Sequence, residues 1–232
     1  MEKFTTEGVV VNATPFRNYD CILTVFTPLD GLVKFFCKAI YKQKKGNHSG
    51  TTTSLAVVEI IYTKGRGDLY LCVEISVVNH HLALRNNLSV LEAACKMLHS
   101  LAATQQPGKS APELYQLFLM YLNKLPQAQF PPAIARSFLL KLLRYEGLLA
   151  FISHCSTCGK LLKDAWIHES EAYCPAHMPS DGLSLNQEER SLVEHLAFSR
   201  DFTQIACIQV SPSLSEKISY LFDKSFKFNS YS

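Results

Sequence analysis

The sequence predicts an α+β fold of several parts, and three observations carry this prediction. Over the first 80 residues, apolar side chains alternate in short stretches with the period of two that is typical of β-strands. After His81 the spacing changes to the 3.6-residue period of α-helices. A cysteine-rich segment then interrupts the helical part near residue 155. A chain of 232 residues with 47% hydrophobic side chains can bury one large core or two modest ones, and we expect two.

The first part of the chain is predicted to be a small barrel. Five segments rich in Val, Ile, Thr, Phe and Tyr are separated by turn residues, and we expect strands over 8–11, 21–27, 31–40, 54–63 and 68–78. Five short strands within 80 residues favour closure of the sheet. A five-stranded barrel of this size fits the OB architecture, whose open face commonly binds single-stranded nucleic acid.

Positive charge gathers in this predicted barrel. Between Lys34 and Arg66, seven basic residues stand against one acid, Glu59, although the formal charge of the whole chain is only +3. We interpret this run as a phosphate-binding face; the alternative is a solvated loop that carries lysines for solubility. The residues predicted to bind nucleic acid are Lys34, Lys38, Lys42, Lys44, Lys45, Arg66 and, beside them, Arg17.

Aromatic residues of the barrel provide rings on which bases could stack. A small barrel also needs large side chains to fill its interior, so we expect most of these rings in the core. The candidates are Tyr19, Phe35, Phe36, Tyr41 and Tyr70.

The helical part shows several start and stop signals. Ser89-Val90-Leu91-Glu92 and Ser110-Ala111-Pro112-Glu113 match capping boxes, and the second helix is expected to stop near Pro126. A third helix is expected over 132–146 with Gly147 as its stop, and further helices open near 184–187 and 211–212. The predicted domains are an OB barrel over 1–80, a helical domain in two parts over 81–153 and 181–232, and a zinc-binding insertion over 154–180.

The sharpest local motif is a pair of metal-binding knuckles. Cys155-Ser-Thr-Cys158 is followed, after fifteen residues, by Cys174-Pro-Ala-His177. Three thiolates and one imidazole at this spacing can surround one tetrahedral ion, which is the closed pattern of a structural Zn²⁺ site. The alternatives are ordinary reduced thiols, or a fourth ligand from His154 or His168.

No catalytic motif accompanies these knuckles. A zinc deaminase would need a His-x-Glu upstream of Pro-Cys-x-x-Cys, and His168-Glu169-Ser170 does not provide it. The proline also follows Cys174 here, whereas that signature places it before the cysteine. Gly108-Lys109-Ser110 resembles the end of a phosphate-binding loop, but Ala103 stands where the first glycine belongs. We therefore expect neither a nucleotide triphosphate site nor an enzyme.

Composition further narrows the class of protein. The five cysteines outside the knuckles stand singly in apolar stretches, so we expect them to be inert buried thiols of a reducing compartment. No long uncharged apolar run and no export signal occurs, which predicts a soluble protein with no membrane partner.

Several segments together resemble the RecO family of bacterial recombination mediators. The stretch Asn18 to Val33, with its Tyr19-Asp20, a strand ending in Phe26-Thr27, and Gly31, is similar to the start of that family. The order of parts agrees as well, and Arg144 to Leu149 resembles the glycine-ended helix before the zinc insertion. The chain departs from the family in its last ligand position, His177 in place of cysteine, and in a barrel loop built from lysine more than arginine.

The resemblance implies a function and a set of partners. Members of this family bind single- and double-stranded DNA without modifying it, anneal complementary strands, and work with RecR to load RecA onto strands covered by the single-strand binding protein SSB. It also implies a bacterial cytoplasmic, nucleoid-associated protein with one structural zinc per chain. The alternative is a zinc-containing RNA-binding or protein-adaptor module with an OB fold.

The same resemblance suggests where partners bind. The family recognises the acidic, apolar C-terminal tail of SSB through its helical domain, and RecR mainly through the barrel end. Such a tail requires an apolar groove beside a cation. We place this groove on the third helix; the alternative is that its cations decorate a bundle surface and pair with acids such as Glu146. The predicted groove residues are Arg136, Phe138, Lys141, Leu142 and Arg144.

Overall fold

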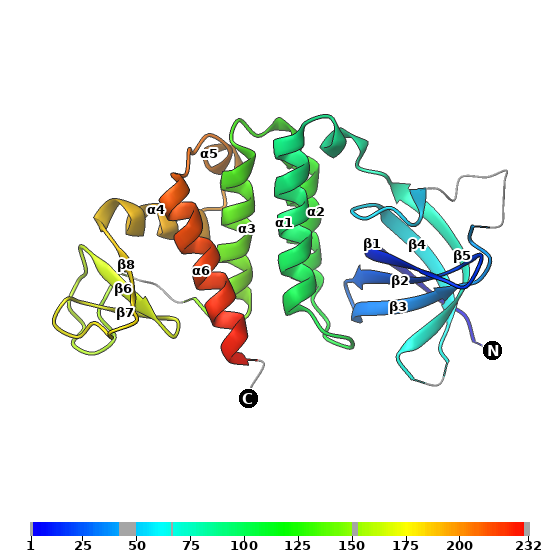
Figure 1. Ribbon diagram of the computed structural model, residues 1–232, viewed down its shortest axis with the longest axis horizontal. Coiled ribbons are helices and arrows are strands. Elements are labelled where there is room, and N and C mark those ends of the chain that lie inside the picture. The colour runs from blue at the N-terminus through cyan, green and yellow to red at the C-terminus, as the bar shows by residue number, and fades with distance from the viewer. Residues whose placement is uncertain (1, 42–49, 66, 150–152, 230–232) are drawn as a thin grey trace. The chain divides into compact units, whose positions relative to one another are not determined.

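The fold was analysed in a computed structural model that describes residues 2–41, 50–65, 67–149 and 153–229. The chain divides into two compact units, residues 1–126 and 127–232, and each is described by itself. No helix in these described ranges is long and apolar enough to cross a membrane. Figure 1 shows the five-stranded part of the first unit and the helices and small sheet of the second.

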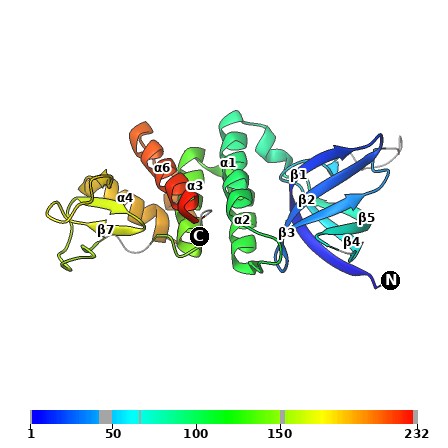
Figure 2. The same ribbon diagram turned by 60° about the horizontal axis from the view of Figure 1, so that its bottom comes forward.

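The first unit contains the predicted barrel. Its five strands close in the order β1-β2-β3-β5-β4, with β3 and β5 parallel and the other pairs antiparallel (Figures 1 and 2). This OB-like closure confirms the predicted fold class. The strands are β1 (Phe4–Phe16), β2 (Asp20–Thr27), β3 (Gly31–Cys37), β4 (Val57–Thr63) and β5 (Leu69–Asn79).

Alternating side chains from these strands fill the barrel. Leu23, Val25 and Phe35 have no exposed surface. The rings of Tyr62 and Tyr70 stack with centroids 5.3 Å apart, and Phe35 meets Tyr62 edge-on. Of the five candidate stacking rings, Phe35 therefore lies in the barrel core and Tyr70 packs against it.

The first two long helices belong to the barrel unit, not to the later helices. Gly108 N donates to Asp30 O (2.8 Å) on the β2–β3 turn, and the Tyr115 hydroxyl donates to Glu7 Oε1 (2.8 Å) on β1. These bonds join the α1–α2 segment to the barrel, in agreement with the compact unit of residues 1–126. The helices are η2 (Leu82–Arg85), α1 (Leu88–Thr104), α2 (Pro112–Lys124) and η3 (Leu125–Gln127).

The starts of these two helices differ from the predicted capping boxes. The Asn87 side chain accepts from the backbone N–H groups of Ser89 (2.9 Å) and Val90 (3.3 Å), so Asn87 and not Ser89 caps α1. At α2 the N-cap position is Ala111, without a side-chain bond. Ser110 lies one residue before the N-cap position, and its hydroxyl donates to Pro28 O (3.5 Å).

The second unit is built around one helix. Helix α3 (Pro131–Tyr145) packs against α4 (Gln187–Phe198), α5 (Phe202–Ala206) and α6 (Pro212–Asn229). Gly147, with φ +74°, ends α3 as predicted. A three-stranded antiparallel sheet in the order β7-β6-β8 lies between α3 and α4 in the sequence, formed by β6 (Ala165–His168), β7 (Glu171–Tyr173) and β8 (Leu183–Leu185).

The cysteines outside the knuckles differ in exposure. Cys21 and Cys37 are buried and Cys72 is half-buried, as expected for small apolar side chains. Cys95 and Cys207 are exposed, so the prediction that all five are buried is wrong for these two. Cys95 lies on the exposed side of α1, which buries the neighbouring Ala93, Ala94, Met97 and Leu98.

Candidate metal centre and nucleic-acid interface

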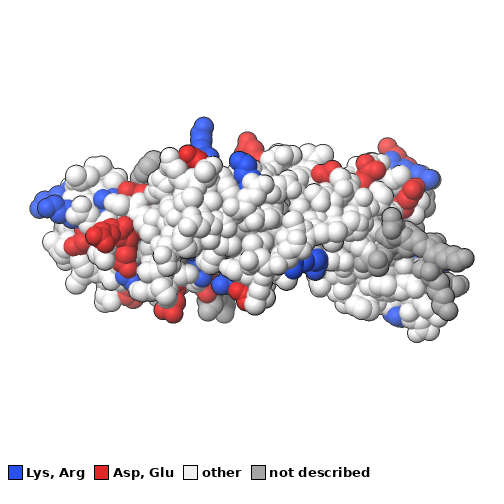
Figure 3. All heavy atoms as spheres, turned by 90° about the horizontal axis from the view of Figure 1, so that it is seen from above, with Lys and Arg blue, Asp and Glu red and all other residues white. Residues whose placement is uncertain are grey.

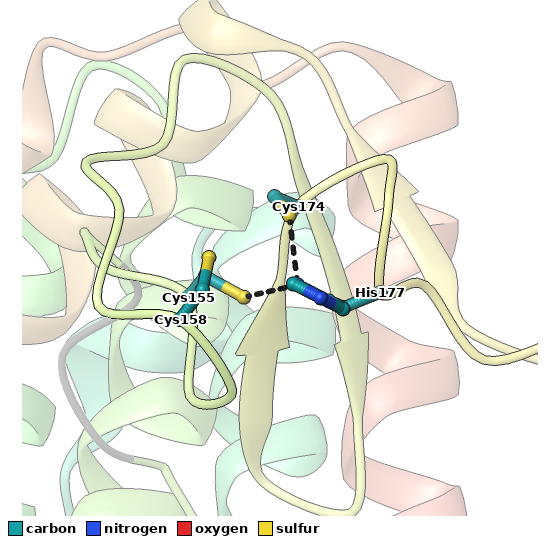
Figure 4. Close-up of side chains that lie close together, drawn as sticks. All are labelled: Cys155, Cys158, Cys174 and His177. Atoms are coloured by element: carbon teal, nitrogen blue, oxygen red, sulfur yellow. Dashed lines mark hydrogen bonds between the residues drawn. The ribbon is translucent and has the colours of Figure 1, made fainter.

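Two backbone turns bring the predicted metal ligands together. Gly159 N donates to Cys155 O (2.8 Å), which curls the first knuckle, and His177 N donates to Cys174 O (2.9 Å), which curls the second after β7. Figure 4 shows the four side chains of Cys155, Cys158, Cys174 and His177 converging on one point. The spacing read from the sequence therefore corresponds to a cluster in space.

The geometry of this cluster fits one tetrahedral ion. The four ligand atoms all lie within 4.8 Å of one another. His177 Nδ1 lies 3.3 Å from Cys174 Sγ and 3.7 Å from Cys155 Sγ. Zinc bonds of about 2.3 Å to sulfur and about 2.0 Å to nitrogen separate tetrahedral ligands by about 3.5 to 3.8 Å. The cluster could hold one metal ion of this type.

The local electrostatics favour a thiolate at Cys155. Burial opposes its ionisation, but backbone hydrogen bonds from Cys158, Cys174 and Thr157, with a further bond from His177, lower the pKa of Cys155 to about 5. The thiolate is the form that ligates metals. Cys155 is thus prepared to bind a cation at neutral pH.

The two competing histidines have other partners. His168 Nε2 lies 3.0 Å from Asp181 Oδ1, and His154 Nδ1 lies 3.1 Å from Ser153 Oγ. Neither belongs to the cluster, which among the described residues is the one group of three or more His, Cys, Asp or Glu with metal-binding geometry. The alternative fourth ligands are therefore not supported.

The outer wall of the barrel combines apolar and basic side chains. The strand registers place Thr14, Ile22, Phe36 and Leu71 in one row across β1, β2, β3 and β5. The next row contains Thr24, Lys34 and Leu69, and a shallow hollow opens over both rows. Because Leu69 and Leu71 are 40% exposed, this wall presents apolar surface to solvent beside a cation.

Two phenyl rings and a guanidinium border this wall. Phe16, which is 39% exposed, meets Phe36 edge-on with ring centroids 5.9 Å apart. The Arg17 guanidinium lies 5.3 Å from the centre of the Phe16 ring. Sequence reasoning missed Phe16, because only the registers of β1 with β2 and of β2 with β3 bring its ring to Phe36.

The predicted nucleic-acid residues fall into two groups. Arg17, Lys34 and Lys38 are exposed on the barrel, as are the rings of Tyr19 and Tyr41. The remaining four predicted residues, Lys42, Lys44, Lys45 and Arg66, lie outside the described residues. On the face that Figure 3 shows, the basic and acidic side chains of the described residues are interspersed without a continuous basic patch.

The predicted groove on α3 is occupied by the unit itself. Phe138 and Leu142 have no exposed surface, so they form core and line no open groove. Arg136 donates from Nε and one terminal nitrogen to the hydroxyls of Ser215 and Ser219, both at 2.6 Å. The apolar side of this helix thus packs against α4, α5 and α6.

The other two cations of α3 bind the end of α4. Lys141 Nζ donates to Ser199 O (2.6 Å), and Arg144 donates to Ala197 O (2.7 Å). These contacts satisfy carbonyl groups at a helix C-terminus, where positive charge is favourable. Burial, with repulsion from Arg144 and Arg200, lowers the pKa of Lys141 to about 8.

The fold and site together define an α+β protein that joins an OB-like barrel to a helical part with a Cys₃His cluster. Residues 1–81 match the family described as "Recombination protein O N terminal", and residues 85–229 match "Recombination protein O C terminal". The chain therefore belongs to the recombination protein O family, and the resemblance noted in the sequence is confirmed.

Relatives from several bacteria agree with this assignment. The chain is 29% identical over 218 residues to a protein named DNA repair protein RecO from Chlamydia pneumoniae, which covers 93% of this chain and 86% of the relative. It is 26% identical over 226 residues to the protein of the same name from Chlamydia trachomatis serovar D, and the match covers 95% of this chain and 91% of the relative. It is 24% identical over 219 residues to the DNA repair protein RecO from Alkaliphilus metalliredigens, and the match covers 92% of this chain and 88% of the relative.

Proposed function

We propose that this chain is a recombination mediator of DNA repair that binds single- and double-stranded DNA without modifying it. The observation that carries the proposal is the exposed wall of the barrel, where Phe16, Phe36 and Leu71 lie beside Lys34 and Arg17. Exposed rings give bases a stacking surface, and cations contact phosphates. Membership of the recombination protein O family supports the same role.

The proposed interface reads no base sequence. Lysine and arginine contacts to phosphates carry no sequence information, and every base offers a face for stacking. Lys38 on the barrel, and the lysines at 42, 44 and 45 with Arg66, would extend the phosphate contacts. Binding of this kind suits a protein that must act on any strand.

The stacking contact is tested with Phe16→Ala. Base stacking on an aromatic side chain is worth about 1 to 3 kcal/mol, so the affinity for a labelled single strand should fall by about five- to 150-fold. Tyr220→Ala removes a comparably exposed ring, 47% exposed, from the second unit and should leave the affinity unchanged. Equal affinities for wild type and Phe16→Ala would contradict binding on this wall.

The RNA-binding or adaptor alternative predicts a different preference. Single-stranded DNA and structured RNA of equal length should be competed against the labelled strand. If the protein is a DNA mediator, unlabelled single-stranded DNA should displace the labelled strand at a lower concentration than structured RNA does. A preference for structured RNA would favour the alternative function.

We further propose that the Cys₃His cluster holds one structural zinc ion. Three thiolates and an imidazole fill all four tetrahedral positions, which leaves no open site for a reacting water or substrate. The ion would clamp a segment whose own core is small, with Leu162, Ala165, Ile167 and Ala172 as its buried apolar residues. Its contribution would be to stability, not to chemistry.

We propose that RecR and the tail of SSB are partners, with the protein helping to load RecA. Because the middle of α3 is buried, the tail would bind at its C-terminal end. A cavity of about 220 Å³ there is lined by apolar side chains that include Leu143, Leu149 and Tyr220, with Lys224 at the same site. An apolar side chain of the tail could enter this cavity beside the lysine.

The tail contact can be tested through the ion pair at this cavity. Lys224 Nζ donates to Asp181 Oδ2 (2.7 Å), so an acidic tail must compete with Asp181. Lys224→Ala should weaken binding of a synthetic tail peptide, and Asp181→Asn should strengthen it. If instead Arg136→Ala/Lys141→Ala/Arg144→Ala weakens binding while Lys224→Ala does not, the tail lies elsewhere on α3.

A further inference from the structure

Three cysteines form a row across the inside of the barrel. Cys21 on β2 is the register partner of Cys37 on β3. On the other side of β3, Phe36 pairs with Leu71 of β5, so the next positions along both strands are Cys37 and Cys72. Phe36 and Leu71 belong to the outer wall, and successive side chains alternate, so both thiols point inward, where they pack with the barrel core.

The spacing of Cys37 and Cys72 suits a covalent bond. Neighbouring strands lie about 4.8 Å apart. A disulfide accepts Cα separations of about 4.4 to 6.8 Å. Both thiols pack in the same core cluster, where they donate to backbone carbonyls: Cys37 to Phe35 O (3.8 Å) and Cys72 to Glu74 O (3.5 Å). No large backbone movement is needed to join them.

The two thiols have unequal environments. Cys72 is half-buried, whereas Cys37 is only 3% exposed. The interaction with Cys37 lowers the pKa of Cys72, and the interaction with Cys72 together with burial raises the pKa of Cys37. Because the thiolate is the nucleophilic form, Cys72 is the thiol that reacts with an oxidant first.

We propose that Cys37 and Cys72 are a reactive dithiol that a hydroperoxide converts into a disulfide joining β3 to β5. The Cys72 thiol releases its proton, its thiolate attacks the peroxide, and the O–O bond breaks, so that Cys72 becomes a sulfenic acid while the departing oxygen takes up the released proton and leaves as an alcohol or water. The Cys37 sulfur then attacks the Cys72 sulfur, the S–O bond breaks, and the Cys37 proton leaves with the hydroxide as water. Overall, two thiols lose two hydrogens and the peroxide is reduced.

The disulfide would strengthen the shortest strand pairing of the barrel, which is that of β3 with β5. The parallel β3–β5 pairing comprises three residue pairs, whereas the β2–β3 pairing comprises seven. A covalent link next to this short pairing opposes separation of β3 from β5 and restricts the conformations of the unfolded chain. Oxidation should therefore raise the thermal unfolding midpoint of the barrel, and a thiol reductant should restore the lower value.

Peptide mapping after peroxide treatment tests the proposal. Trypsin cleaves after Arg17, Lys34, Lys38, Arg66 and Arg85, so the three cysteines fall in separate peptides, 18–34, 35–38 and 67–85. Freshly purified, unchelated protein is treated with hydrogen peroxide, its remaining thiols are alkylated, and the digest is examined by mass spectrometry. We expect peptide 35–38 linked to peptide 67–85, in a yield that does not depend on protein concentration.

Single substitutions make the result specific. Cys72→Ser should abolish the linked peptide and the rise in the unfolding midpoint, whereas Cys21→Ser and Cys95→Ser should retain both. Peptide 35–38 linked to 18–34 would overturn the proposal. So would an oxidised Cys72 in a protein whose Cys37 remains fully alkylated. Cys72 is half-buried, so its substitution also tests the proposal if Cys37→Ser fails to fold.

Discussion

The proposed DNA interface makes a quantitative prediction about salt. Arg17→Ala/Lys34→Ala removes two exposed cations that flank the apolar wall of the barrel. Each phosphate contact to a single strand contributes about 0.7 to the slope of log affinity against log salt, so the slope should become shallower by about 1.4. When salt rises from about 50 to 200 mM, the ratio of wild-type to variant affinity should therefore fall by about sevenfold.

Fluorescence anisotropy of a labelled single strand, titrated at several salt concentrations, measures this slope. The control Lys96→Ala/Lys163→Ala removes the same charge from exposed positions outside the barrel and should leave the slope at its wild-type value. Lys42→Ala/Lys44→Ala/Lys45→Ala should make it shallower by about two. If the barrel variants and the control gave equal slopes, the barrel cations would not contact phosphates and the solvated-loop interpretation would hold.

Further predictions concern the metal and the helical core. Cys158→Ser should eliminate stoichiometric zinc in elemental analysis and lower stability, while Cys95→Ser retains one zinc per chain; absence of metal from fresh wild-type protein would refute the site. Phe138→Ala should cost about 3 to 5 kcal/mol in urea unfolding because its ring is fully buried. Leu161→Ala, 69% exposed, should change stability by less than about 0.5 kcal/mol, and a similar small effect of Phe138→Ala would contradict a core role for this ring.

Local patterns in the sequence predicted the parts whose geometry is local. The four ligands lie in two short turns, so spacing alone identified Cys155, Cys158, Cys174 and His177 as one cluster. Strand alternation likewise located the barrel, because a side chain's face follows from its neighbours two residues away. Gly147 signalled the end of α3 because a left-handed residue there favours glycine.

Features that depend on distant segments could not be predicted in this way. Phe16 reaches Phe36 only through the register of three strands. The sequence predicts Phe138 in an open groove on α3. The packing of three helices around α3, which no local pattern reveals, makes Phe138 core. Ser110 has the capping pattern, but its hydroxyl bonds to Pro28, which lies far away in the sequence.

The central claim is that this protein acts as a mediator on DNA strands covered by SSB. Its most direct test is annealing of complementary strands coated with SSB, compared with strands coated with SSB that lacks its C-terminal tail. We predict that the wild-type protein accelerates annealing, and that deletion of the tail greatly reduces this acceleration. Equal annealing rates with intact and tail-deleted SSB, or no acceleration in either case, would contradict the claim.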